Sequence, residues 1–85
     1  MDNTQKILVV DDEENIRLIF KKALEKKNYL VHTASSAEDA IRKIRKQKYF
    51  LVFSDIFMDG ISGLDLLKEI KATAPQVKVV IMTAQ

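Results

Sequence analysis

The sequence predicts a single α/β domain with a parallel sheet, its elements following the order βαβαβαβ. First, short apolar runs rich in β-branched residues alternate with segments whose apolar residues recur at helical spacing. Second, alternating units of this kind imply right-handed crossovers and parallel strands. Third, 85 residues allow only one small domain, because a short chain buries a modest share of its surface.

The first half of the chain supplies two strands and a helix. KILVV, residues 6–10, is a continuous apolar run typical of a strand covered on both faces. YLVHTA, residues 29–34, predicts the second strand, with His32 at the surface of a sheet edge. Between them lies an amphipathic helix with an acidic first turn and lysines in its last turn, and Asn28 is a plausible stop. The inward-facing residues of this helix are expected to be Ile16, Ile19, Phe20, Ala23 and Leu24.

A second helix is predicted from SSAE, in which Ser35 stands three residues before Glu38, the spacing of a capping box. The basic run RKIRKQK, residues 42–48, lies on the same helix. We interpret it as the solvated face of the helix, with a nucleic-acid patch as the less favoured alternative. The inward-facing residues are expected to be Ala37, Ala40, Ile41 and Ile44.

Two further strands and one helix complete the predicted domain. YFLVFS, residues 49–54, and VKVVIMT, residues 77–83, are apolar runs that predict the third and fourth strands. The intervening helix follows Gly63 and stops before Pro75, since the residue before a proline disfavours helical geometry. Its apolar stripe is expected to hold Leu64, Leu67 and Ile70.

Polar residues stand where three of these strands end. Asp11 and Asp12 follow the first strand, Asp55 follows the third, and Thr83 closes the fourth. Open parallel sheets bind ligands outside the carboxyl ends of their strands, so these side chains are expected to meet at one rim. For any single acid the alternative is ordinary capping of a loop or helix.

The predicted acid cluster indicates a particular chemistry. Three carboxylates a few ångströms apart cannot all stay ionised without a cation. Oxygen ligands without histidine or cysteine favour a hard ion such as Mg²⁺. A carboxylate beside such an ion can attack phosphorus and form an acyl phosphate. Phosphoryl transfer to an aspartate is therefore one reaction that such a site could carry out.

The segments ILVVDDEE, DIFMDGISG and VVIMTAQ, at these spacings, resemble the receiver domain of two-component response regulators. The resemblance covers the whole chain and implies a flavodoxin-like sheet with strand order 2-1-3-4. It implies that Asp55 accepts a phosphoryl group from a phosphohistidine on a sensor histidine kinase. It further implies Mg²⁺ bound by Asp12, Asp55 and the backbone carbonyl of Phe57, with Asp11 helping through water.

The resemblance also assigns roles beside the acids. Thr83 would be the switch hydroxyl that moves towards the phosphate, with the backbone of Ala84 beside it. Phe57 and Gln85 would modulate hydrolysis of the acyl phosphate, and a bulky Phe57 would slow it. Asp59 stands where the family usually has proline.

The sequence is shorter than the usual receiver domain of the family that it resembles. The sequence ends after its fourth strand, and no residue matches the phosphate-binding lysine that the family carries on a fifth strand. Residues 1–85 are therefore expected to form an incomplete receiver domain. Its fourth strand would be an exposed edge, with apolar residues such as Val52 and Val80 partly bare, and self-association through this strand is expected.

Composition narrows the class of protein. The net charge of +2 is too small to predict direct contact with nucleic acid. The sequence has no cysteine, no membrane span and no signal-peptide pattern, which favours a cytoplasmic module. The partner would be a sensor kinase, and the motifs resemble receivers attached to transcriptional activators. Catalysis would be confined to the chain's own phosphorylation.

Three alternatives remain open at this point. One is an inactive or engineered fragment of the receiver fold that self-associates through its fourth strand. Another is a pseudo-receiver that binds a protein without phosphoryl chemistry. The third is an Mg²⁺-dependent phosphohydrolase, which VVDDEEN disfavours because that class usually carries D-x-D at its first strand.

Overall fold

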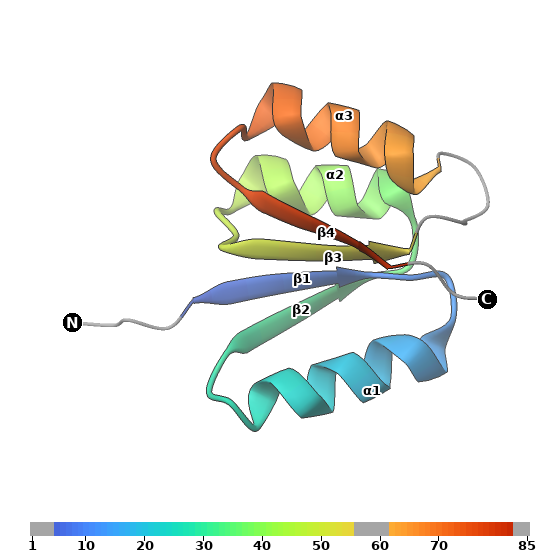
Figure 1. The fold of residues 1–85 in the computed structure, drawn as a ribbon, viewed down its shortest axis with the longest axis vertical. Coiled ribbons are helices and arrows are strands. Elements are labelled where there is room, and N and C mark those ends of the chain that lie inside the picture. The colour runs from blue at the N-terminus through green and yellow to red at the C-terminus, as the bar shows by residue number, and fades with distance from the viewer. Residues whose placement is uncertain (1–4, 56–61, 83–85) are drawn as a thin grey trace.

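The computed structural model describes residues 5–55 and 62–82, and within these ranges the predicted alternation of strands and helices is present (Figure 1). The strands are β1 (Lys6–Val10), β2 (Leu30–Ala34), β3 (Leu51–Asp55) and β4 (Lys78–Met82). The helices are α1 (Glu14–Glu25), α2 (Ala37–Lys46) and α3 (Gly63–Thr73). All pairings are parallel and the strand order is β2-β1-β3-β4, which confirms the predicted fold.

The helices cover the two faces of the sheet unequally. Helices α2 and α3 lie on one face, and α1 lies on the other (Figure 1). The larger core packs Leu8, Val10 and Val52 against Leu66 and Ile70. A smaller core joins Ile7, Val9 and Val31 to half-buried residues that include Phe20, Leu24 and Phe53. After Lys6, strand β1 is apolar and buried to its end, as expected of a strand covered on both faces.

The helix ends confirm one prediction and correct another. Asn28 adopts a left-handed conformation (φ 70°), as expected of the residue that stops α1. The predicted N-cap Ser35 is wrong by one residue. Ser36 is the N-cap, because its extended backbone places Oγ 3.1 Å from the Asp39 amide, which donates to it. Ser62 caps α3 in the same way, accepting from the Asp65 amide.

The apolar stripe predicted for α3 is also partly wrong. Leu64 is 52% exposed and Leu67 is half-buried, whereas Leu66 is fully buried beside Ile70. Leu66 and Ile70 are four residues apart, so they share the face that packs on the sheet and α2. In α1, Phe20 and Leu24 share the inward face by the same spacing, and Ile19, expected inside, is 63% exposed.

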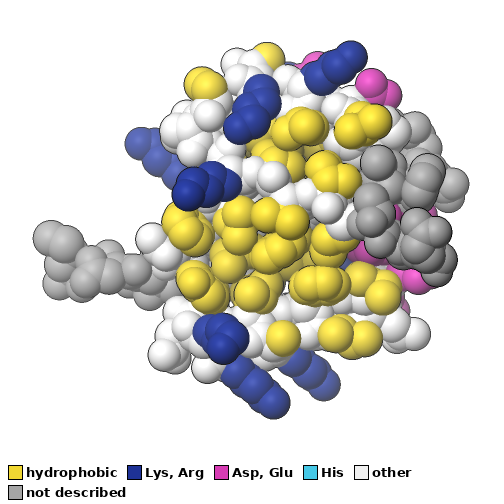
Figure 2. Space-filling view, viewed as in Figure 1, with side chains coloured by type: hydrophobic (Ala, Val, Ile, Leu, Met, Phe, Trp, Pro, Cys, Tyr) yellow, Lys and Arg dark blue, Asp and Glu magenta, His cyan; other side chains and the backbone are white. Residues whose placement is uncertain are grey.

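Bare apolar surface occurs on one face of the sheet. The expectation for Val52 was wrong: it is fully buried because it points towards α2 and α3. The expectation for Val80 was right, since it is 41% exposed beside Phe53 in the β3–β4 register. Hydrophobic side chains form a broad patch over the sheet between α3 and α1 (Figure 2). Helix α1 packs mainly on β1 and β2, so it leaves this part of the face uncovered.

Candidate functional site

Three acidic side chains meet at the carboxyl ends of β1 and β3. Carboxylate oxygens of Asp11, Asp12 and Asp55 all lie within 4.8 Å of one another. Asp11 and Asp12 directly follow β1, and Asp55 is the last residue of β3. Because β1 and β3 are neighbours in the sheet, the two strand ends deliver these acids to the same point. The predicted convergence of the three acids is confirmed.

Asp11 is the most deeply placed of the three acids, with only 4% of its surface exposed. Its Oδ1 accepts a hydrogen bond of 2.9 Å from the backbone N–H of Glu13. Burial raises the pKa of Asp11, the Glu13 N–H opposes that rise, and the negative charges of Asp55 and Asp12 add to it. The ionised form of Asp11 is therefore less favourable than that of a free aspartate.

Asp55 and Asp12 are more accessible. Asp55 is half-buried, and Asp12 is exposed. The fully buried Ser54 donates from Oγ to the backbone carbonyl of Asp55 at 3.0 Å, which helps to fix the end of β3. Exposure to solvent therefore increases across the cluster from Asp11 through Asp55 to Asp12.

The donor set fits a hard divalent cation. All three side chains offer carboxylate oxygen, and the cluster contains no histidine or cysteine ligand. Mg²⁺ takes a few carboxylate oxygens and keeps waters, which leaves room for a phosphate oxygen. The residues present therefore suit Mg²⁺ better than zinc or copper.

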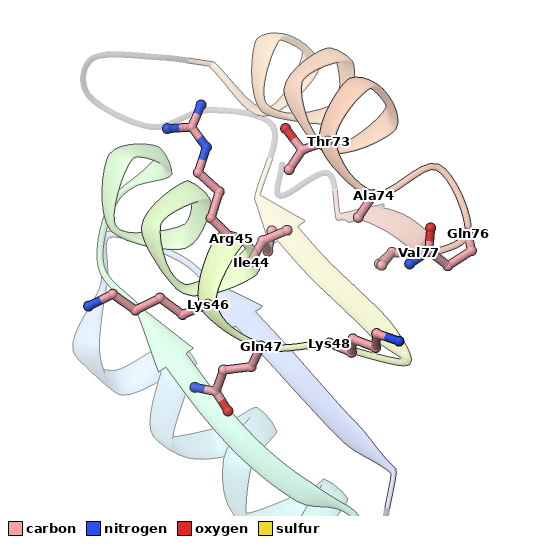
Figure 3. Close-up of a pocket in the computed structure, with 9 residues that line it drawn as sticks. All are labelled: Ile44, Arg45, Lys46, Gln47, Lys48, Thr73, Ala74, Gln76 and Val77. Carbon is pink, nitrogen blue, oxygen red and sulfur yellow. The ribbon is translucent and has the colours of Figure 1, made fainter.

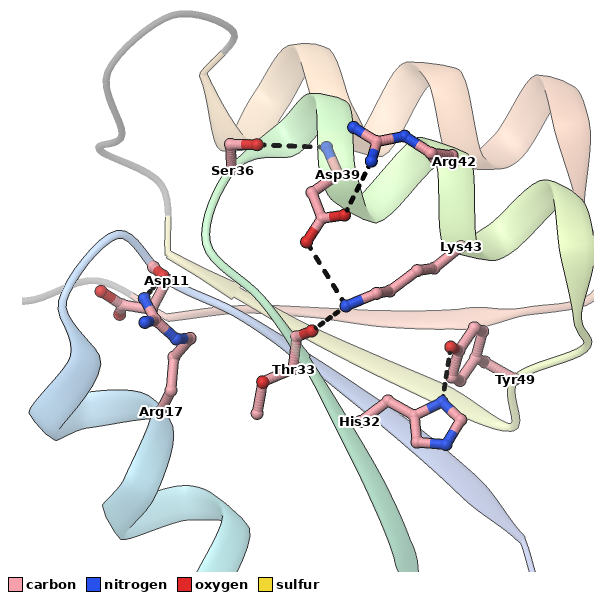
Figure 4. Close-up of polar contacts among 9 residues, drawn as sticks. All are labelled: Asp11, Arg17, His32, Thr33, Ser36, Asp39, Arg42, Lys43 and Tyr49. Carbon is pink, nitrogen blue, oxygen red and sulfur yellow. Dashed lines mark hydrogen bonds and ion pairs between the residues drawn. The ribbon is translucent and has the colours of Figure 1, made fainter.

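Arg17 also reaches this rim, and sequence reasoning missed it. Its Nη1 donates to the backbone carbonyl of Asp11 at 2.8 Å (Figure 4). The available signal was one arginine about one turn into a helix that begins with the acidic Glu14. That position lets a long side chain turn back to the preceding loop.

Several predicted site residues lie outside the described residues. They are Phe57, Asp59, Thr83, Ala84 and Gln85. Their assigned roles stay predictions.

The polar residues near the β2 edge belong to the scaffold. His32, predicted at the surface, is half-buried, and its Nδ1 lies 2.8 Å from the Tyr49 hydroxyl (Figure 4). Burial lowers the pKa of His32, and Lys6, Lys43 and Lys21 lower it further. Helix α2 covers this edge, which is why His32 is less exposed than an edge strand suggests.

The basic run of α2 does not form a convergent binding site. Arg42 and Lys43 both pair with Asp39, at 3.4 and 3.3 Å. A hollow of about 410 Å³ lies between the last turns of α2 and α3, at the opposite end of the sheet from the acids. Figure 3 shows the head groups of Arg45 and Lys46 pointing away from it. The interpretation as a solvated helix face is therefore retained.

No helix within the described ranges is long and apolar enough to cross a membrane.

Comparisons with known proteins agree on one family. The family model described as the response regulator receiver domain matches residues 7–85. The alginate biosynthesis transcriptional regulatory protein AlgB of Pseudomonas putida is 41% identical over 83 residues, which is 98% of this chain and 18% of AlgB. Sporulation initiation phosphotransferase F of Bacillus subtilis is 32% identical over 80 residues, 94% of this chain and 64% of that protein. The chain thus spans about a fifth of the length of AlgB.

Solved structures give the same result. The response regulator TrrA of Thermotoga maritima, in complex with Mg²⁺-BeF, is 41% identical with a TM-score of 0.92, covering 96% of this chain and 71% of TrrA. TrrA in complex with the histidine kinase ThkA gives 42% identity and a TM-score of 0.90, covering 95% of this chain and 70% of that one. The sheet order, the acids at the strand ends and these matches lead to one conclusion: the chain belongs to the response regulator receiver domain family.

Proposed function

We propose that this chain is a phosphoacceptor receiver module in which Asp55 takes a phosphoryl group from a phosphohistidine of a sensor histidine kinase. The observation that carries the proposal is the meeting of Asp11, Asp12 and Asp55 within 4.8 Å at the carboxyl rim of the sheet. Membership of the receiver family supports it. The relative TrrA, solved with Mg²⁺-BeF and with the kinase ThkA, supports the same choice of cofactor and partner.

The three acids take different roles in this proposal. A carboxylate oxygen of Asp55 forms the bond to phosphorus, while the bond from phosphorus to the histidine nitrogen breaks and leaves its electron pair on the imidazole. Asp11 and Asp12 hold Mg²⁺ together with Asp55 and the backbone carbonyl of Phe57. When bound, Mg²⁺ neutralises charge on the phosphoryl oxygens.

The remaining roles concern the phosphorylated state. Thr83 and the backbone of Ala84 bind the phosphoryl oxygens, and Phe57 and Gln85 set the rate of acyl-phosphate hydrolysis. The chain catalyses no reaction beyond its own phosphorylation. Its setting is the cytoplasm, and any contact with nucleic acid belongs to another domain of a parent protein.

The test is the intact mass of the chain after incubation with acetyl phosphate and Mg²⁺. The wild type should gain one phosphoryl group, and Asp55→Asn should gain none. Asp65→Asn, which alters an exposed acid in the first turn of α3, is the matched control and should be phosphorylated like the wild type. A wild type that stays unmodified would favour a pseudo-receiver or an inactive fragment of the fold.

The exposed β4 edge favours a second proposal, self-association of the chain through this strand. Strand β4 is the outermost strand of the described sheet on one side, and its Val80 is 41% exposed. Hydrophobic side chains also form a broad patch on the face of the molecule that Figure 2 shows. A strand at the edge of a sheet is a template for pairing with another chain. Sedimentation velocity should show a dimer that Val80→Lys weakens. A concentration-independent monomer would overturn this second proposal without affecting the first.

A further inference from the structure

Arg17 makes a contact that links α1 to the loop carrying two of the acids. The residue lies in the second turn of α1 and is half-buried. Its Nη1 donates to the backbone carbonyl of Asp11 at 2.8 Å, and Figure 4 shows the guanidinium turned towards Asp11. The Arg17 amide also donates to the Glu13 carbonyl at 3.2 Å, so both ends of the residue are anchored to the same loop.

The carbonyl that Arg17 holds belongs to the peptide group between Asp11 and Asp12. Two other bonds fix the Asp11 side of this peptide. The Asp11 amide donates to the Ala34 carbonyl at 3.1 Å, and its Oδ1 accepts from the Glu13 amide at 2.9 Å. Arg17 supplies the third restraint, and it is the one that acts on the orientation of the peptide plane leading to Asp12.

Asp12 depends on its backbone for its position. Its side chain is exposed, and its carboxylate makes no hydrogen bond to another described residue. A rotation of the preceding peptide would move the Asp12 Cα and carry its carboxylate away from Asp11 and Asp55. Side chains that orient the ligands of a metal ion affect its affinity although they do not touch it.

We propose that Arg17 is a positioning residue for the cation site. By holding the Asp11 carbonyl, it fixes the Asp11–Asp12 peptide and presents the Asp12 carboxylate to a divalent cation. The effect is one of preorganisation: the loop is ordered before the cation arrives, so less ordering is needed on binding. The inference rests on the proposed function, because it takes Mg²⁺ as the ion that the three acids hold.

The experiment compares two methionine substitutions one turn apart on α1. Arg17→Met keeps most of the apolar stem but removes the donors. Lys21→Met removes the same charge from a lysine whose partner is Glu25, away from the acids. Isothermal titration with Mg²⁺ should show binding about tenfold weaker in Arg17→Met, in the range seen for residues behind metal ligands. Lys21→Met should stay within twofold of the wild type, and Arg17→Lys should recover part of the loss because an ammonium also donates.

A second measurement, by NMR, reports on the loop after β1 in the absence of metal. The Glu13 amide donates to the Asp11 carboxylate, so its ¹H–¹⁵N resonance reports on the loop that Arg17 holds. In Mg²⁺-free buffer this resonance should move in Arg17→Met and stay in place in Lys21→Met. Should Arg17→Met fail to fold by circular dichroism, Arg17→Gln, whose amide is too short to reach the carbonyl, takes its place with the same expectations.

The possible outcomes distinguish the role of Arg17 from the existence of the cation site. A wild type that binds Mg²⁺, with an Arg17→Met variant that binds it equally well, overturns the role of Arg17 and leaves the cation site intact. Weakened binding with an unmoved Glu13 resonance also overturns it, since the loop would then be unaffected. A wild type that binds no Mg²⁺ contradicts the proposed cation site itself and this inference with it.

Discussion

Val10 of β1 lies opposite Ser54 of β3 in parallel register, and this pairing brings the residues that follow them, Asp11 and Asp55, to the same rim. The sheet therefore supplies the geometry of the site, and the carboxylates that it brings together repel one another. Asp11 is buried next to two other carboxylates. Burial of Asp11 beside two like charges should therefore lower the stability of the fold when no cation is bound.

Asp11→Asn should raise the free energy of unfolding in Mg²⁺-free buffer at pH 7, by on the order of 1 kcal/mol. Burial raises the pKa of Asp11 above its ordinary value of 3.8, and the charge of Asp55 adds to the rise. Stability from this group is thus complete below pH 3.8 and is lost as pH rises through the raised folded pKa. The neutral amide avoids that loss. Urea denaturation measures the change, with the exposed Glu69→Gln as control; a destabilised Asp11→Asn would contradict the prediction.

The contribution of His32 to the free energy of unfolding should decrease as the pH is lowered from 7.5 to 5.5. Burial lowers the pKa of His32 in the folded chain, and Lys6 and Lys43 lower it further. Below the ordinary histidine pKa of 6.5 the unfolded chain binds a proton that the folded chain resists. The stability present above that pH is therefore lost as pH falls towards the folded pKa. His32 is the only histidine in the sequence, so His32→Gln should flatten urea midpoints measured across this range. An unchanged slope in His32→Gln would assign the effect to other groups.

Two leucines of α3 should respond very differently to truncation. Leu66→Ala should cost about 2–5 kcal/mol, because a fully buried leucine leaves a cavity. Leu64→Ala, at a side chain that is 52% exposed, should cost less than about 1 kcal/mol. Thermal unfolding followed by circular dichroism compares the pair. A loss in Leu64→Ala as large as that in Leu66→Ala would contradict the difference in packing between the two leucines.

Two adjacent serines offer the same kind of test at the start of α2. Ser36→Ala should cost about 1 kcal/mol, since the Asp39 amide loses its acceptor. Ser35→Ala should have little effect, because Ser35 precedes the cap and is exposed. Urea denaturation of the two single variants decides which serine is the N-cap, and a larger loss in Ser35→Ala would reverse the assignment.

The strand order and the acid cluster were predictable because both follow from topology. A βαβ chain returns each strand in the same direction, so residues that end the strands must share a rim. The position of Asp11 next to Asp55 required only that β1 and β3 be neighbours, as the receiver resemblance implied. No side-chain detail was needed for this part of the site.

The errors arose where neighbouring residues are chemically alike. Ser35 and Ser36 each precede an acid by three positions, Glu38 and Asp39 respectively, so spacing alone does not choose between them. Likewise α3 carries leucine at 64, 66 and 67, which leaves the phase of its apolar stripe ambiguous. The backbone conformation of Ser36 and its hydrogen bond decide the first case, and packing of α3 against α2 and the sheet decides the second.

The two contacts that the sequence did not predict join groups whose proximity no motif encodes. His32 of β2 contacts Tyr49, which lies in the connection between α2 and β3, 17 residues further along the chain. Arg17 reaches backwards from a helix to a loop backbone, and a backbone carbonyl carries no sequence signal. Such contacts require the folded coordinates.

The different burial of the three acids also affects the order in which ligands can bind to the cluster. Asp12 is exposed to solvent, whereas Asp11 is buried. An ion or molecule that approaches the cluster therefore meets the carboxylate of Asp12 first. The phosphoryl donor of the proposed function is itself an anion, so the negative charge of the three carboxylates repels it as long as no cation has joined them. For the proposed function, charge therefore favours binding of the cation before the donor.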